Sequence, residues 1–162
     1  MNRAPFIERV RDLLNYDAQT GEFTWRYTRQ GVPAGPAGSY SGNGYLYITI
    51  DLQKYSAHRL AWLYVHGKWP NDQIDHINGN RADNRLINLR EVTGAVNNQN
   101  QRRARTDNKS CGLLGVSKNR DKWRARIWLG GVERCLGSFP TPEEAHKAYL
   151  KAKRKLHPGC EI

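Results

Sequence analysis

Four polar residues follow one another along the middle of the chain in an order that can build a site for phosphodiester hydrolysis. They are Asp75, His76, Asn88 and Asn97. The imidazole of His76 titrates near neutral pH, which suits a general base that deprotonates water. The carboxylate of Asp75 and the amide of Asn97 offer oxygen ligands to a hard cation. Two protein ligands leave room for water and a substrate phosphate, which favours Mg²⁺, with Mn²⁺ as the alternative.

The elements that must position these residues can be predicted from the local pattern. The pattern predicts a strand over Gln73–His76 that leads into a loop at Asn78-Gly79. It predicts a second, returning strand over Leu86–Val92. Thr93 is a suitable N-cap for a polar helix that we expect to run through Arg103. Neighbours in a regular strand face opposite ways, so Asp75 and His76 can converge only where the strand ends or twists.

The part of the chain before this site has a β-like pattern from Phe6 to about Gln53. Tyr45–Leu52 alternates, so that Leu46, Ile48, Ile50 and Leu52 should share one face of a strand. Ala57–His66 reads as a short helix stopped by Gly67.

The part after the site predicts a sheet followed by one helix. We expect strands near Leu114–Asn119, Lys122–Leu129 and Val132–Ser138. Thr141–Glu144 forms a capping box that starts the helix. Its apolar positions, which should pack on the sheet, are Ala145, Ala148, Tyr149, Ala152 and Leu156.

Composition points to a polyanionic partner. The 162 residues include 26 Lys and Arg against 15 Asp and Glu, a formal net charge of +11, and a phosphate backbone suits such a surface. A merely soluble basic protein and a binder of acidic membranes are the alternatives. No segment resembles a membrane span or a signal peptide. Cys111, Cys135 and Cys160 form no CxxC pair, which argues against structural zinc and disulfides. We therefore expect a cytoplasmic protein, of a cell or of a phage-infected host.

The strand Lys122–Leu129 offers a surface for that partner. Trp123, Ala125, Ile127 and Leu129 should face the helix, whereas Lys122, Arg124, Arg126 and Trp128 should face outward. A basic, aromatic sheet face suits contacts with phosphates and base edges of DNA. The same composition fits an ordinary solvated strand face, and such sheets also bind RNA.

The central segment resembles the HNH endonucleases, and most closely the phage-type homing enzymes with Asn at the third motif position. The matching residues are His58–Trp62, Gly67–Pro70, Ile74–Asn80, Asn84, Asn88–Arg90, Thr93 and Asn97–Asn100. The resemblance covers roughly His58 to Arg102 and implies a ββα-metal fold. It also implies that His76 is the base, that Asp75 and Asn97 bind the metal, and that Asn88 holds the loop that orients the imidazole. His58, Arg59 and Arg90 match recurrent family positions, where we expect phosphate contact or scaffolding.

The last segment resembles the AP2 DNA-binding domain. The matching residues are Gly115-Val116, Lys122–Ala125, Ile127, Leu136–Phe139, Thr141, Glu143–Ala145 and Ala148-Tyr149. The resemblance implies a three-stranded antiparallel sheet packed on one helix, with the sheet in the major groove of DNA. The residues at the family's DNA-facing positions are Ser117, Asn119, Arg126, Trp128, Glu133 and Cys135.

The predicted fold class is α+β, with an N-terminal β-rich segment, a ββα-metal core and a C-terminal three-stranded antiparallel sheet packed on one helix. The predicted divisions are an N-terminal segment 1–56, an HNH core 57–105, a linker 106–111 and an AP2-like domain 112–162. The residues expected to bind DNA are His58, Arg59, Arg90, Arg102, Arg103, Lys122, Arg124, Arg126 and Trp128.

The function predicted from these patterns is a metal-dependent HNH endonuclease of the homing type that acts on double-stranded DNA. One such site cuts one strand, so a monomer should nick, whereas a dimer could cut both strands. No membrane and no protein partner is required. The alternative is a non-catalytic DNA-binding regulator on the same HNH/AP2 scaffold, and an RNA-binding protein is a third possibility.

Overall fold

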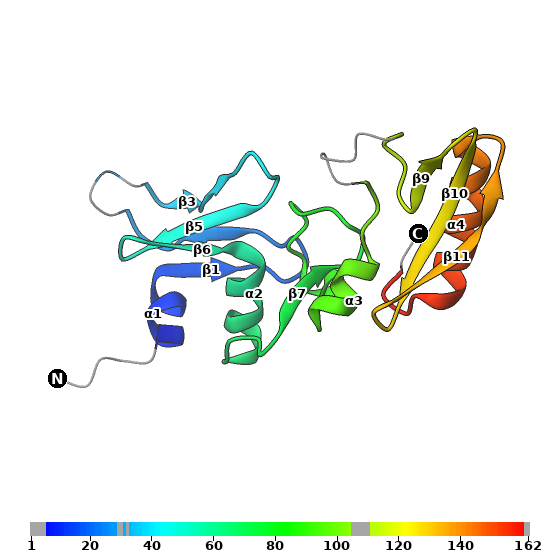
Figure 1. Ribbon diagram of the computed structural model, residues 1–162. Helices are drawn as coiled ribbons and strands as arrows, with labels where there is room; N and C mark the ends of the chain where they lie inside the picture. Colours follow the sequence, from blue (N-terminus) through cyan, green and yellow to red (C-terminus); the bar gives the residue numbers. More distant parts are fainter. Residues whose placement is uncertain (1–5, 29–30, 32, 105–110, 161–162) are drawn as a thin grey trace. The chain divides into compact units, whose positions relative to one another are not determined.

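The structure is a computed structural model that describes residues 6–28, 31, 33–104 and 111–160. It confirms the α+β class and divides into two compact units, Met1–Thr93 and Gly94–Ile162 (Figure 1). The boundary at Thr93 falls inside the predicted core 57–105, and the four-part functional division stays a prediction. Apart from Cys111, the predicted linker 106–111 lies outside the described residues.

Three small sheets and two α-helices make up the described part of the first unit. One sheet has the order β1-β2-β3, another β4-β5-β6, and β7 pairs with β8 in a hairpin. The elements are α1 (Phe6–Leu13), β1 (Leu14–Tyr16), β2 (Phe23–Trp25), β3 (Gly35–Pro36), β4 (Ser39–Tyr40), β5 (Leu46–Ile50), β6 (Gln53–Ser56), α2 (Ala57–His66), β7 (Gln73–His76), the 3₁₀ turn η1 (Leu86–Asn88) and β8 (Leu89–Val92).

The core of the first unit lies between the two helices and the sheets. Its fully buried side chains include Val10, Leu14, Ile48, Ile50 and Leu60. α1 corrects the expectation of a β-like pattern from Phe6 onward. Phe6, Val10 and Leu13 recur at helical spacing and place one apolar face on the core, and this signal outweighs the local β propensity.

A tight turn corrects the expected face of Leu52. β5 ends at Ile50, and Ile50 pairs with Gln53 across a two-residue turn. Asp51 and Leu52 have positive φ values of 48° and 67°, as hairpin turns of this length require. Ile48 and Ile50 are buried as expected, whereas Leu52 is 100% exposed. The turn contains no glycine, so the sequence pattern does not indicate it.

The helix expected over Ala57–His66 is confirmed as α2. Gly67 ends it with φ 74°, and its backbone N–H donates to the carbonyl of Leu63. The returning strand is shorter than expected, because residues 86–88 form the turn η1 and pairing with β7 begins at Leu89.

The second unit contains a three-stranded antiparallel sheet of order β11-β10-β9, covered on one face by a long helix (Figure 1). Its elements are α3 (Gly94–Gln99), β9 (Val116–Asn119), β10 (Lys122–Leu129), β11 (Val132–Phe139) and α4 (Pro142–Leu156). α3 ends at Gln99, so the expected helix through Arg103 is wrong. No helix among the described residues is long and apolar enough to cross a membrane.

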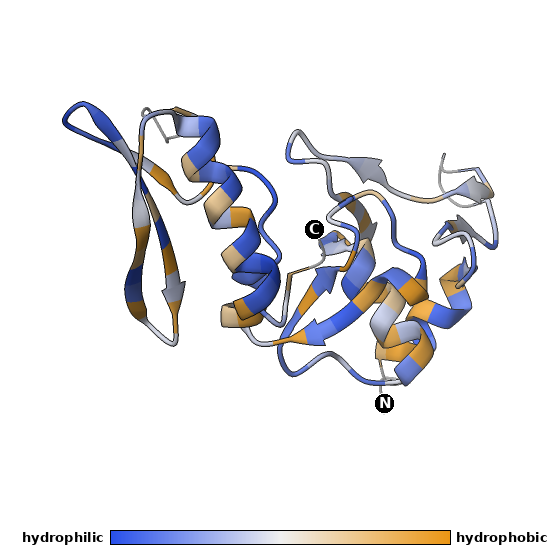
Figure 2. Ribbon diagram, turned by 90° about the vertical axis from the view of Figure 1, so that its right-hand side faces the viewer, coloured by the Kyte–Doolittle hydropathy of each residue, from blue (hydrophilic) through white to orange (hydrophobic). Residues whose placement is uncertain are grey.

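The two faces of β10 differ as the alternation predicts, and hydrophilic and hydrophobic residues interchange along the long strands of this unit (Figure 2). Ala125 and Ile127 are buried against Ala145 and Tyr149 of α4. Trp128, on the other face, is 61% exposed. The Oγ1 atom of Thr141 accepts a 3.3 Å hydrogen bond from the N–H of Glu144, which confirms the predicted cap.

The apolar stripe predicted for α4 is only partly right. Ala145 and Tyr149 are buried, but Leu156 is 40% exposed. Lys153 is buried in the same unit, at 1% exposure, although a lysine is among the residues least expected inside a protein.

Gly21 is a position where we expect an added methyl group to destabilise the first unit. Its φ is 78°, and a Cβ there would lie 2.4 Å from the backbone nitrogen of Arg85. Gly67 is the matched control, with φ 74° and nothing within 4 Å of the added Cβ. Both alanine variants incur backbone strain, and Gly21→Ala also incurs the clash, which should cost about 2 kcal/mol more. Urea unfolding measures the difference, and equal losses in the two variants would contradict the contact.

Candidate active site

Three of the predicted site residues lie at the end of β7 and in the turn before β8, and all three are buried. Asp75, His76 and Asn88 are only 6%, 4% and 5% exposed. Asp75 lies opposite Arg90 and His76 opposite Leu89 in the β7–β8 ladder. The backbone N–H of Ile77 donates to the carbonyl of Asn88 at 2.9 Å, which closes the base of the connecting loop.

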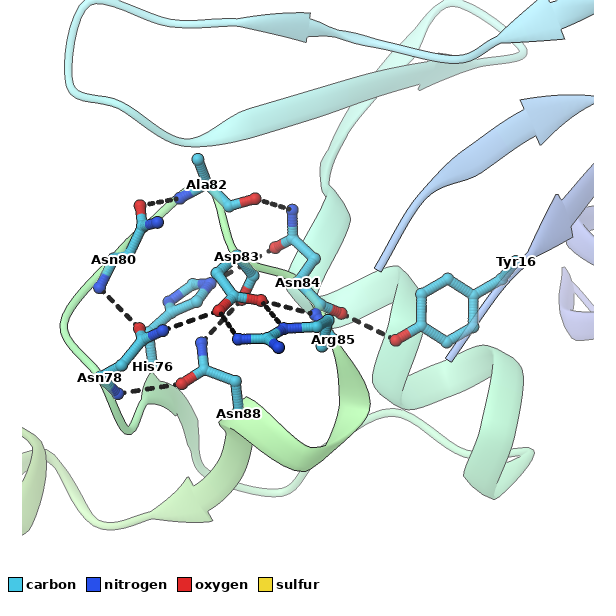
Figure 3. A network of polar contacts seen from close by, with 9 residues as sticks. All are labelled: Tyr16, His76, Asn78, Asn80, Ala82, Asp83, Asn84, Arg85 and Asn88. Atoms are coloured by element: carbon cyan, nitrogen blue, oxygen red, sulfur yellow. Dashed lines mark hydrogen bonds and ion pairs between the residues drawn. The ribbon is translucent and has the colours of Figure 1, made fainter. Parts of the chain in front are cut away.

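The side chain of Asn88 holds the two ends of this loop. Its Oδ1 atom accepts a 2.9 Å hydrogen bond from the backbone N–H of Asn78. Its Nδ2 atom donates to the carbonyl of Asp83 at 2.8 Å (Figure 3). A single buried amide therefore fixes where the loop leaves β7 and where it returns, as expected for a residue that orients the neighbouring imidazole.

Side chains within the loop make it rigid between those ends. Oδ1 of Asn78 accepts from the N–H of Asn80, and Oδ1 of Asn80 accepts from the N–H of Ala82, at 2.8 and 3.1 Å. Asp83 receives the Asn78 amide at 2.7 Å and the Arg85 guanidinium at 2.6 Å. These partners, with Arg85 foremost, lower the pKa of Asp83 to about 2, so this carboxylate stays charged.

The imidazole of His76 is held by Asn84. The Nε2 atom of His76 lies 3.3 Å from Oδ1 of Asn84, and the amide nitrogen of Asn84 donates to the carbonyl of Ala82. Because an amide oxygen can only accept, Nε2 carries the proton and Nδ1 is the basic nitrogen. The hydroxyl of Tyr16 donates to the carbonyl of Asn84 at 2.7 Å, which ties the first sheet to this position.

Asn84 was part of the matching motif, but sequence reasoning gave it no role. Its only signal was its place in the ordered set of asparagines. Burial lowers the pKa of His76 below its ordinary value, and the hydrogen bond to Asn84 acts in the opposite direction. The imidazole is therefore neutral near pH 7, which is the form a general base needs.

Asp75 is paired across the hairpin with Arg90. The Nε and Nη2 atoms of Arg90 both donate to Oδ2 of Asp75, at 3.0 and 2.9 Å. This arrangement fits the scaffolding role expected for Arg90, because it fixes the carboxylate beside His76 on the same strand.

The predicted metal ligands are oxygen donors, and their chemistry fits a hard cation such as Mg²⁺. Asp75 offers a buried carboxylate, and Asn97 offers an amide from α3 in the second unit. Among the described residues, no three His, Cys, Asp or Glu side chains are grouped to hold a metal ion. The pairing of Asp75 with Asn97 spans the two units and stays a prediction.

A second histidine borders the site. The ring of His58, on α2, lies 5.1 Å from that of His76 and 5.3 Å from that of Tyr45. Its Nδ1 atom is buried and has no hydrogen-bond partner among the described residues. Burial, with a smaller contribution from His76, lowers the pKa of His58 to about 3. The adjacent Arg59 donates to the carbonyl of Asp72 at 3.3 Å, so the structure gives it a scaffolding contact.

The remaining residues predicted to bind DNA lie in the second unit. Arg102 and Arg103 follow α3, and Lys122, Arg124, Arg126 and Trp128 lie on β10. Arg126 forms a 2.9 Å ion pair with Glu133 on β11. Lys122 and Trp128 are exposed, whereas Arg124 is half-buried. The DNA-binding roles of all these residues stay predictions.

Acid should destabilise the fold partly through His58. The unfolded chain protonates this imidazole near pH 6.5, but the folded protein resists protonation down to a pKa of about 3. The free energy of unfolding therefore falls as the pH drops below 6.5, by about 1–2 kcal/mol between pH 6.5 and 5. In His58→Gln, this contribution to the decrease in the free energy of unfolding should be absent. In His66→Gln, which changes an exposed position of the same helix, the decrease should be as large as in wild type. Urea unfolding at both pH values measures the effect, and identical acid losses in His58→Gln and wild type would contradict it.

Comparisons with known proteins point to one family over part of the chain. Residues 55–99 match the family described as HNH endonuclease. Over 112 residues, the chain is 31% identical to an uncharacterized HNH endonuclease of Acanthamoeba polyphaga mimivirus, and the match covers 68% of this chain. The chain spans 57% of the length of that relative. No solved structure matches the chain significantly. The segment that contains β7, η1, β8 and α3 is thus similar to the HNH endonuclease family.

Proposed function

We propose that this protein is a metal-dependent HNH endonuclease that hydrolyses phosphodiester bonds in double-stranded DNA. The observation that supports this most directly is the buried pair Asp75-His76, held by Arg90 on one side and by Asn84 on the other. The family match over residues 55–99 supports the same reaction class.

In this mechanism Nδ1 of His76 accepts the proton of the attacking water. The hydrogen bond from Nε2 to Asn84 keeps this tautomer and fixes the ring, and Asn88 keeps the loop that carries Asn84 in place. Burial keeps the imidazole neutral and ready to accept a proton. A bound divalent cation would offset the negative charge that develops on the phosphate and the leaving oxygen.

Asp75 and Asn97 are the residues proposed to hold that cation, with Mg²⁺ as the first choice and Mn²⁺ as the alternative. Arg90 keeps the carboxylate of Asp75 in a single orientation, which lowers the cost of ordering it when a cation binds. One such site cuts one strand, so a monomer nicks DNA.

The second unit is proposed to bind DNA as an AP2-like domain, through the face of β10 opposite α4. Its three-stranded antiparallel sheet packed on one helix is the architecture that the resemblance implied. A nuclease core joined to such a domain fits an enzyme of the homing type, in which the added domain recognises the target.

Supercoiled plasmid distinguishes this proposal from the alternative, a non-catalytic DNA-binding regulator. The full-length protein should relax the plasmid in the presence of Mg²⁺, and EDTA should prevent relaxation. A shift of DNA in a gel without any cleavage, with either Mg²⁺ or Mn²⁺, would instead support the regulator.

His76→Ala should lower the nicking rate by about 10²–10⁴-fold, because it removes the proposed general base. DNA affinity should change little, since the imidazole is buried. The exposed His66 provides the control, and His66→Ala should cleave like wild type. Single-turnover nicking and a parallel gel-shift titration measure the two effects. A His76→Ala rate within a few-fold of wild type would remove this residue from the mechanism.

Lys122→Ala and Arg126→Ala should weaken DNA binding and flatten its salt dependence. Each lost phosphate contact should reduce the slope of log affinity against log salt by about one unit. The effect of Arg126→Ala should be the smaller of the two, since its ion pair with Glu133 must be released before it contacts DNA. Lys151→Ala, at an exposed position on the opposite helix α4, is the charge-matched control. If the β10 variants keep the wild-type slope, DNA is bound elsewhere.

A further inference from the structure

The helix that carries the proposed metal ligand Asn97 is too short to be stable by itself. α3 spans six residues, Gly94–Gln99, and none of them is buried. Isolated helices of this length do not form in water, because the free-energy cost of nucleating a helix exceeds the stabilisation that a single turn provides. Contacts from another segment must therefore hold α3 in its helical form.

Backbone hydrogen bonds extend the helical winding of this segment slightly beyond Gln99. The N–H of Asn100 donates to the carbonyl of Asn97 at 3.1 Å, and the N–H of Gln101 donates to that of Asn98 at 3.3 Å. The carbonyl of Gln101 lies at the end of these turns, where the helix itself provides no donor partner.

The buried lysine of α4 provides that partner. Nζ of Lys153 donates to the carbonyl of Gln101, and the side chain of Lys153 is 1% exposed. A cation at the C-terminal end of a helix interacts favourably with the helix dipole as well as with the carbonyl. The contact joins the end of the α3 segment to a helix 52 residues farther along the chain.

The chain end after α4 makes a second contact with α3. The backbone N–H of Gly159 donates to Oε1 of Gln99 at 3.2 Å. Gly159 also approaches the backbone of α3 so closely that an added Cβ would lie 2.4 Å from the carbonyl oxygen of Val96. The two hydrogen bonds hold the residues just after Asn97, and the close approach to Val96 packs Gly159 against the residue just before it.

Burying this lysine is costly, which suggests that its position has a function. Loss of hydration is the main cause that lowers the pKa of Lys153, and the charge of Arg102 adds to it. The Tyr149 ring lies 5.9 Å from Nζ. An apolar residue at this position would avoid the cost of desolvation but could not bind the carbonyl of Gln101.

We infer that Lys153 is a positioning residue for the nuclease site, because it holds α3 and thereby Asn97 from within the C-terminal unit. This inference rests on the proposed function of Asn97 as a metal ligand. It assigns the C-terminal unit a part in cation binding in addition to DNA binding. It also implies that a core ending near residue 105 lacks the contacts that keep α3 folded.

Hydrogen exchange of the full-length protein tests the structural part of the inference without metal or DNA. In Lys153→Met, the amides of residues 97–101 should exchange at least about tenfold faster than in wild type. Gly159→Ala should increase exchange in the same segment through its clash with Val96. Lys155→Met, an equal change of charge at an exposed position of α4, is the control and should leave this exchange unchanged. Unchanged exchange in both Lys153→Met and Gly159→Ala would overturn the inference.

A metal titration tests the functional part. Lys153→Met should raise the Mg²⁺ concentration at half-maximal nicking several-fold, with DNA affinity close to that of Lys155→Met. In the Asn97→Ala background, the same substitution should have no further effect on the midpoint, because it acts through Asn97. A purely structural role of Lys153 would instead lower activity equally in both backgrounds and leave the midpoint in place.

The two experiments separate this inference from the proposed function. If Asn97→Ala leaves the metal midpoint unchanged, Asn97 is not a ligand and the proposed metal site is wrong. If Asn97→Ala shifts the midpoint and Lys153→Met does not, the metal site stands and the positioning role of Lys153 is wrong.

Discussion

The β7–β8 hairpin depends on one requirement, which is that polar groups removed from water must find partners inside the protein. Asp75, His76, Asn84 and Asn88 are all buried, and each has a hydrogen bond or an ion pair. Asn88 provides these partners for the loop backbone. Its side-chain amide forms hydrogen bonds with the backbone at the beginning and at the end of the loop, at Asn78 and Asp83. The same network of bonds that stabilises the loop thus also fixes the imidazole of His76 through Asn84.

Burial keeps the imidazoles of His58 and His76 neutral, and an ion pair fixes the carboxylate of Asp75. Burial lowers the pKa values of His58 and His76, and the rings lie 5.1 Å apart. Arg90 forms an ion pair with Asp75 across the ladder, and Asp75 immediately precedes His76 on β7. Within the connecting loop, Arg81 lies over the Tyr45 ring and donates to the carbonyl of Asn43, which attaches the loop to an earlier part of the chain.

In the second unit, the two faces of the sheet have different surroundings. Ala125 and Ile127 pack on α4, and the opposite face of β10 displays exposed Trp128 beside the pair Arg126–Glu133. The end of α4 and the residues after it contact the α3 segment through Lys153 and Gly159. The unit that contains this sheet therefore also supports the short helix that carries Asn97.

The sequence by itself determined the elements whose signals are local. Periodicity and caps located α2, β7, β10 and the start of α4, because these patterns depend only on neighbours along the chain, and the ordered polar motif selected His76 and Asn88 as candidate site residues. The tertiary structure decided what depends on distant segments. The bond from Tyr16 to the Asn84 carbonyl joins residues 68 positions apart, and the bond from Lys153 to the Gln101 carbonyl joins residues 52 positions apart. Partners so far apart leave no periodic signal, since they are selected by packing and by the need to satisfy buried polar groups rather than by local conformation.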